Sequence, residues 1–245
     1  MRAIRTLWAR ELAACFLSPI AYVMMVAFLL VSGLSFLVTV FKNEGRPEPL
    51  SMYLFAGDAI WLPILVAVVT MRLFAEELRS GTIENLMTVP ITDVQIVVGK
   101  FLGAYTFLVA VLAPTALFVV ILERISPGLS PADLDPGAFL WGGIILFLVT
   151  GLFLAVGMFC SLLSQNQIIA AILSISLNWL LLLAGWLLLS VPGIDPEFAT
   201  FLSVTAHIED FARGSVEARQ FFFYIISTSF MLFVSVRTLQ ARRLK

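Results

Sequence analysis

Charged residues are scarce in this chain of 245 residues. Only 13% of the residues are Asp, Glu, Lys or Arg, whereas 60% are hydrophobic, and the mean hydropathy is +1.02. A soluble domain of this size could not bury so much apolar surface, so lipid is the expected solvent. The formal net charge of −1 provides no general basic surface, and we therefore expect no nucleic-acid partner.

The residues that build metal and nucleotide sites are also scarce. The chain has one histidine and two distant cysteines, Cys15 and Cys160, so we expect neither a metal site of the usual kind nor a disulfide. It also lacks a G-x-x-x-x-G-K-[ST] phosphate loop, because Val94 stands where a glycine would have to precede Gly99-Lys100. We therefore expect no nucleotide hydrolysis by this chain.

Long uncharged runs make up most of the sequence. Residues 136–194 contain no Asp, Glu, Lys, Arg or His, and a single helix of that length would cross about three bilayer cores. This run must fold back, and Gln165-Asn166-Gln167 is the natural place. Six spans fit the whole pattern, at about residues 20–41, 54–75, 97–122, 138–163, 168–191 and 219–237. The sequence thus predicts one all-α integral membrane domain over residues 1–245.

Several predicted helices have a capping side chain at their start. These caps are Thr92 with Gln95, Asp135, Asn166, Asp195 and Ser215. Asp195 lies in the long outer loop 192–216, which could dip into the membrane as a short helical pair.

The distribution of Lys and Arg predicts the orientation of the spans. If the N-terminus is inside, ten of the 15 basic residues fall on the inner side: Arg2, Arg5, Arg10, Arg72, Arg79, Lys100, Arg237, Arg242, Arg243 and Lys245. Both termini, and the loop between spans two and three, are therefore expected on the cytoplasmic side.

Residues 1–17 are predicted to form a helix that lies on the membrane surface. Their apolar side chains at helical spacing are Ile4, Leu7, Trp8, Leu12 and Phe16. We expect this face to enter the headgroup layer while the arginines of the segment point toward lipid phosphates. A plain cytoplasmic extension of the first span is the alternative.

A short charged stretch, Glu76 to Pro90, separates spans two and three. Ser80 is placed to cap a helix of about two turns, with Glu84 near its positive end and Pro90 as its stop. The apolar face of this helix would be formed by Ile83, Leu86 and Met87. Two turns are not stable alone in water, so the helix must pack on the membrane surface or in a groove of a partner. The mostly acidic flanking charges suit an anionic membrane surface poorly.

In this region the chain resembles the ABC type-2 exporter permeases. The resemblance rests on Thr70-Met71-Arg72, Ala75-Glu76-Glu77, Gly81-Thr82-Ile83-Glu84-Asn85-Leu86, Pro90-Ile91 and Val98-Gly99-Lys100-Phe101. Other stretches resemble the gliding-motility-associated branch, whose relatives include the nitrous-oxide-reductase-maturation permeases. These stretches are Arg10-Glu11-Leu12, Ser18-Pro19-Ile20-Ala21-Tyr22 and residues 206–214.

The resemblance implies a permease subunit of an exporter in a prokaryotic inner membrane. In that family the loop helix is a cytoplasmic coupling helix, seated in a cleft of a separate ABC ATPase subunit that uses ATP and Mg. Carried over to this chain, the ATPase-docking site would comprise Glu76, Glu77, Arg79, Gly81, Thr82, Ile83, Glu84, Leu86, Met87 and Pro90. A second permease copy or a paralogue would complete the membrane part. The external gate candidates are His207, Glu209, Asp210 and Arg213.

Two other function classes fit a membrane protein less well. A stand-alone secondary carrier or channel would need ionisable groups within its spans, and only Asp58 lies near a span interior, where we expect it at the outer headgroup level. An intramembrane enzyme would need a nucleophile–base or metal pair at membrane depth, but the only histidine lies outside the predicted spans. Export of a lipid, peptide, polysaccharide or drug would leave the same sequence pattern.

Overall fold

The computed structural model describes residues 2–42, 49–82, 91–125 and 135–243. Throughout this part of the chain the regular elements are helices, which confirms the all-α prediction. They are α1 (Arg2–Leu17), α2 (Pro19–Lys42), α3 (Leu50–Thr70), α4 (Ala75–Ser80), α6 (Asp93–Leu112), the 3₁₀ turn η1 (Ala113–Thr115), α7 (Ala116–Ile125), α8 (Pro136–Leu163), α9 (Gln167–Leu189), α10 (Pro196–Phe201), α11 (Val204–Ala212) and α12 (Ala218–Arg243).

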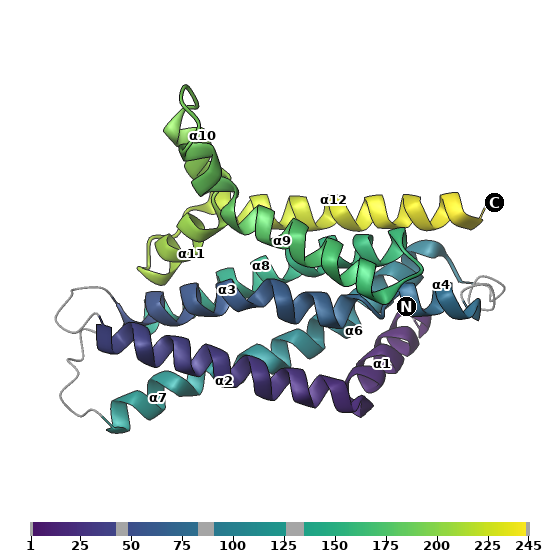
Figure 1. Ribbon diagram of the computed structural model, residues 1–245, viewed down its shortest axis with the longest axis horizontal. Helices are drawn as coiled ribbons and strands as arrows, with labels where there is room; N and C mark the ends of the chain where they lie inside the picture. Colours follow the sequence, from purple (N-terminus) through teal and green to yellow (C-terminus); the bar gives the residue numbers. More distant parts are fainter. Residues whose placement is uncertain (1, 43–48, 83–90, 126–134, 244–245) are drawn as a thin grey trace.

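Six stretches of the described chain are helical, long and apolar enough to cross a membrane. They are Pro19–Lys42, Leu50–Ser80, Asp93–Phe118, Pro136–Leu163, Gln167–Leu189 and Ala218–Arg242, so the prediction of six spans is confirmed. Both chain ends and α4 lie at the same end of the bundle, opposite α7 (Figure 1). This arrangement agrees with the expectation that the termini and the loop after the second span share one side of the membrane.

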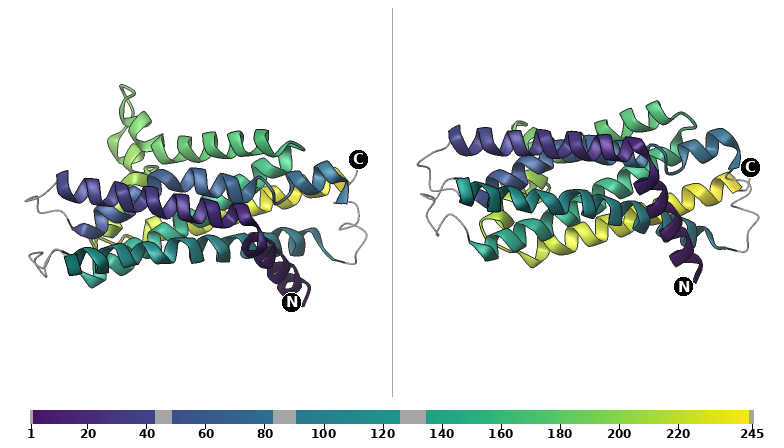
Figure 2. Two further views of the ribbon diagram at one scale, coloured as in Figure 1. Left: turned by 60° about the horizontal axis from the view of Figure 1, so that its bottom comes forward. Right: turned by 90° about the horizontal axis from the view of Figure 1, so that it is seen from below.

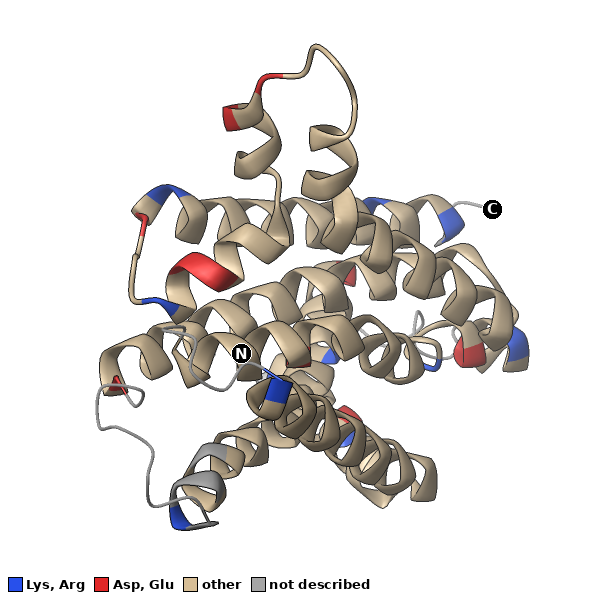
Figure 3. Cartoon of the chain, turned by 60° about the vertical axis from the view of Figure 1, so that its left-hand side comes forward, with Lys and Arg blue, Asp and Glu red and all other residues tan. Residues whose placement is uncertain are grey.

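Helix α8 forms the centre of the bundle. Of its most apolar window 72% is buried, compared with 17% for α2 and 22% for α12. It packs against α3, α6, α9, α11 and α12. The long helices carry few charged residues along their lengths (Figure 3). The outward faces of α2, α9 and α12 are therefore apolar surfaces that lipid or another subunit must cover.

Most of the predicted helix caps are confirmed. Gln95 N–H donates to the Thr92 hydroxyl at 3.3 Å, and Thr92 N–H donates to the Gln95 side chain at 3.2 Å, forming a capping box. Three further caps accept a backbone N–H at a helix start: Asp135, Asn166 and Asp195. The prediction for Ser215 was wrong, because α12 begins at Ala218 and the Ser215 N–H is instead bonded to the Asp210 carbonyl.

Helix α1 turns away from α2 and crosses α6 at close range (Figure 2). A Cβ atom added at Gly99 would lie 2.7 Å from the Leu7 Cβ, and one added at Gly103 would lie 2.6 Å from the Glu11 Cβ. Only a residue without a side chain allows the two backbones to approach this closely.

The apolar face of α1 is used partly for packing against α6. The Trp8 indole N–H donates to the Thr106 hydroxyl at 3.1 Å, and the Phe16 ring meets the Phe107 ring edge-on at a centroid distance of 5.2 Å. The helical form expected for residues 1–17 is present from Arg2 to Leu17. Its position in the headgroup layer stays a prediction.

Asp58 is fully buried between α2 and α3, where the Ser32 hydroxyl donates a hydrogen bond to its Oδ1. Ser32 is itself buried. The sequence did not predict this burial, which arises because α2 packs along α3 and covers Asp58. The position of Asp58 at the outer headgroup level stays a prediction.

We predict that Gly103→Ala lowers the melting temperature of the purified protein in detergent. The new methyl group must push α1 away from α6, and overpacking of this kind costs about 1–3 kcal/mol. Gly143→Ala is the matched control, since an added Cβ there has its nearest neighbour, the Phe55 ring, at 3.9 Å. Equal melting temperatures for the two variants would contradict the close packing of α1 on α6.

Candidate functional site

The predicted docking segment begins in α4. The described residues of this segment are Glu76, Glu77, Arg79, Gly81 and Thr82, whereas Ile83, Glu84, Leu86, Met87 and Pro90 lie outside the described residues. Ser80 is the last residue of α4, and its hydroxyl donates to the Glu76 carbonyl at 2.9 Å. Gly81 follows with a φ of 71°, a left-handed conformation that commonly ends a helix. The sequence thus missed α4 itself, a helix that precedes the predicted one.

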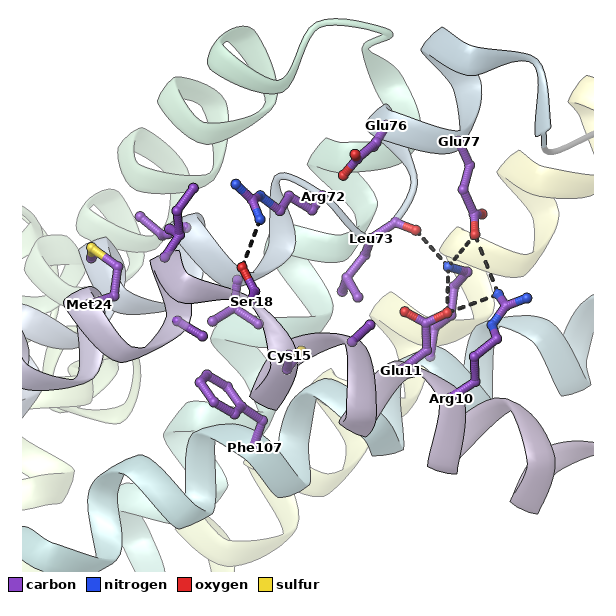
Figure 4. A pocket seen from close by; sticks show the side chains of 16 residues that line it. Arg10, Glu11, Cys15, Ser18, Met24, Arg72, Leu73, Glu76, Glu77 and Phe107 are labelled. Carbon is purple, nitrogen blue, oxygen red and sulfur yellow. Dashed lines mark hydrogen bonds and ion pairs between the residues drawn. The ribbon is translucent and has the colours of Figure 1, made fainter.

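A buried lysine joins α4 to α1 and α6. The Lys100 Nζ lies 2.8 Å from the Glu77 Oε1 and 3.1 Å from the Glu11 Oε1, and it donates to the Leu73 carbonyl at 2.8 Å. The three N–H donors of the ammonium group therefore have three acceptors. The Lys100 side chain is 1% exposed. Figure 4 shows Glu11 and Glu77 approaching from opposite sides.

Arg10 completes an ion cluster with Lys100, Glu11 and Glu77 and forms its solvent-exposed rim. The Arg10 Nη2 lies 3.0 Å from the Glu11 Oε1 and 3.5 Å from the Glu77 Oε1, but the Arg10 side chain is 53% exposed. Solvent therefore screens the Arg10 pairs more strongly than those of Lys100. On the buried side, the Phe74 ring centroid lies 5.2 Å from the Lys100 Nζ and adds a cation–π contact.

A side chain of the central helix holds the beginning of α4. The Ser161 hydroxyl, on α8, accepts hydrogen bonds from the N–H groups of Phe74 at 3.1 Å and Ala75 at 3.0 Å. The first N–H groups of a helix have no partner within it, so Ser161 acts as a cap supplied by another helix. The start of the docking segment is therefore fixed both to α8 and, through Glu77, to α1 and α6.

A cavity of about 410 Å³ opens beside the ion cluster, where α1, α2, α3, α4 and α6 meet (Figure 4). Arg72 and Ser18 lie on its wall, and the Arg72 Nη1 donates to the Ser18 hydroxyl at 3.1 Å. Cys15 also lines the cavity, and burial together with the neighbouring Glu11 carboxylate raises the pKa of its thiol to about 11. This thiol is therefore a poor nucleophile at neutral pH.

At the other end of the bundle, His207 on α11 is a packing residue. Its ring is 1% exposed, and the Nδ1 lies 3.0 Å from the Tyr224 hydroxyl on α12. Burial lowers the pKa of His207 to about 4, with partial opposition from the Asp210 carboxylate. The imidazole is thus neutral at physiological pH and links α11 to α12.

The other gate candidates have different hydrogen-bond partners from His207. The Asp210 Oδ2 accepts from the Gln220 amide at 3.2 Å, and the exposed Arg213 lies 3.6 Å from the Met52 sulfur. Glu209 is partly exposed on the same helix. The gate assignment stays a prediction, since these contacts describe packing and not chemistry.

A family comparison covers most of the chain. The family model of the ABC-2 family transporter proteins matches residues 17–185. The match runs from the end of α1 into α9 and includes the predicted docking segment and Lys100. No curated protein matches the chain.

We predict that Lys100→Met destabilises the protein strongly. The Glu11 and Glu77 carboxylates, which share this ammonium, would then repel each other without a buried counter-ion. Breaking a buried ion pair by removing one partner costs about 3–5 kcal/mol. Thermal denaturation of the purified protein measures the effect, with Arg10→Gln as the exposed control, expected to cost less than about 1 kcal/mol. Similar losses for the two variants would contradict the central role of Lys100.

We predict that acid destabilises the protein through His207. Between pH 6.5 and about 4 the unfolded chain binds a proton that the folded protein excludes, so stability falls as the pH falls through this range. His207 is the only histidine, so His207→Gln should reduce the drop in melting temperature between about pH 7 and about pH 5. A drop of the same size in the variant would show that His207 is not buried in neutral form.

Proposed function

Because the chain belongs to the ABC-2 family of transporter proteins, we propose that it is the permease subunit of an ATP-driven exporter in a prokaryotic inner membrane. An ABC ATPase subunit docks on the segment from Glu76 to Pro90 and supplies the ATP and Mg chemistry, since this chain has no phosphate loop. A second permease copy or a paralogue completes the membrane part, and both chain ends lie in the cytoplasm. The gliding-motility-associated branch stays a prediction.

The observation that carries this proposal is the attachment of α4 to the rest of the bundle. A loop helix that only connected two spans would need no buried ion pairs to helices elsewhere in the chain. Here Glu77 shares the buried Lys100 with Glu11, which ties α4 to α6 and α1. Ser161 of α8 holds the start of the same helix. Such an attachment is what a segment needs if force applied to it is to reach the spans.

The proposed mechanism follows from these attachments. ATP closes the ATPase pair and displaces the docked segment. Through Lys100 and Ser161 this displacement moves α6 and α8 as well, because hydrogen-bonded ion pairs and closely packed helices deform little when one of them is displaced. The permease interface then opens for export.

A stand-alone carrier is the second candidate, and Asp58 is the observation in its favour. A buried carboxylate within a span is a candidate for proton or cation coupling. Asp58, however, accepts a hydrogen bond from the Ser32 hydroxyl and does not line the cavity beside the ion cluster. The family match favours the ATP-driven exporter.

Co-purification with the ATPase encoded beside this chain tests the proposal. Glu84→Arg or Leu86→Asp should abolish the complex, because a reversed or buried charge cannot enter the cleft. Arg124→Glu is the control, since it reverses an exposed charge on α7 at the opposite end of the bundle. Retention of the ATPase by the first two variants, at the level seen for the control, would refute docking at this segment.

A further inference from the structure

Two cavities follow one another along the seam between α2 and α3. The first, of about 410 Å³, lies beside the ion cluster and has a partly charged wall. The second, of about 190 Å³, is lined only by apolar side chains of α2 and α3, among them Phe28, Val31 and Trp61. Met24 lines both cavities, so the first cavity, here called the polar chamber for its charged residues, adjoins the second at this side chain.

Arg72 is the incompletely satisfied cation of the polar chamber. Its Nη1 donates to Ser18, but its buried Nε has no hydrogen-bond partner within the described residues. No carboxylate of those residues forms an ion pair with it. A buried donor without an acceptor costs free energy, so the site favours a ligand that supplies oxygen atoms. Phosphate fits the planar guanidinium particularly well, since it can accept two parallel N–H bonds.

The other charged residues of the chamber indicate which kind of phosphate-containing headgroup would fit. Lys100 and Arg10 are paired with Glu11 and Glu77, which leaves Arg72 and Glu76 as one charge of each sign. Glu76 lies on the Arg72 side of the chamber, at its solvent-exposed rim (Figure 4). A purely anionic headgroup would meet repulsion from Glu76, whereas a headgroup with a phosphate and an amine would meet both charges favourably.

We propose that the two cavities bind one phospholipid with an ethanolamine-type headgroup. The phosphate is held by Arg72 and Ser18, the ammonium faces Glu76, and an acyl chain follows the α2–α3 seam past Met24 toward Trp61. The helix rise places Trp61 about 14 Å from Thr70, where α3 ends two residues before Arg72, and this length suits part of an acyl chain. The lipid fills the corner where α1 meets α2, next to the Lys100 cluster. This inference does not depend on ATPase docking.

Native mass spectrometry of the delipidated, purified chain tests the proposal. Phosphatidylethanolamine, phosphatidylglycerol of the same acyl chains and inorganic phosphate are added separately. Phosphatidylethanolamine should be retained best. Arg72→Gln should weaken its retention about tenfold or more, as expected for one lost charge-assisted hydrogen bond. Glu76→Gln should remove the preference over phosphatidylglycerol. Arg237→Gln is the matched control and should have no effect, because Arg237 is exposed on α12 and outside both cavities.

Met24→Trp provides a second test that keeps every charge. The larger side chain blocks the junction of the two cavities and should lower lipid retention, while circular dichroism and size-exclusion chromatography verify the fold. Equal phosphatidylethanolamine retention by wild type, Arg72→Gln and Met24→Trp would overturn the proposal. Equal or better binding of phosphatidylglycerol would overturn the headgroup assignment. Binding of inorganic phosphate without lipid retention would identify a free-anion site instead.

Discussion

A positive charge buried at the end of a membrane span must be neutralised inside the protein, and Lys100 imposes this requirement here. Charged groups are costly in a low-dielectric interior unless they are paired and hydrogen-bonded. The acceptors come from three places: Glu11 on α1, Glu77 on α4 and the carbonyl of Leu73. That carbonyl is available because the helix of the second span breaks after Thr70. This one ammonium group therefore binds an acceptor from α1, one from α4 and one from the break in the second span.

The same requirement couples segments that are distant in the chain. Gly99 and Gly103 flank Lys100 on α6, and both lack the side chain that would hold α1 away. Charge pairing and close backbone contact therefore act at the same crossing. A displacement of α4 cannot leave α1 and α6 unchanged without separating buried charges, which is costly. In the proposed exporter, this makes the three helices one mechanical unit at the cytoplasmic end.

Sequence reasoning predicted what depends on local pattern and left out what depends on long-range pairing. The spans follow from uncharged runs, and the Thr92–Gln95 capping box follows from residues three apart. Lys100 was recognised only as one of the inner positive charges, because its partner Glu11 is 89 residues away in the chain. The stretches quoted for the family resemblance nevertheless contain Glu11, Glu77 and Lys100, which was the one available signal. Burial of Asp58 was missed because nothing local shows that α2 covers this face of α3.

The two ends of the bundle are held by different kinds of interaction, and this difference bears on the direction of transport. Buried ion pairs hold the α4 end, whereas the described contacts of α11 at the other end are the neutral one between His207 and Tyr224, aromatic packing with Phe223 and a hydrogen bond from the Gln220 amide to the Asp210 carboxylate. Parting neutral hydrogen-bonded and aromatic surfaces costs less than parting buried charges, because no uncompensated ion is left behind. An exporter driven from the α4 end needs stronger interactions at that end than at the α11 end. In the proposed exporter, the driven end would stay intact while the far end separates to release the cargo.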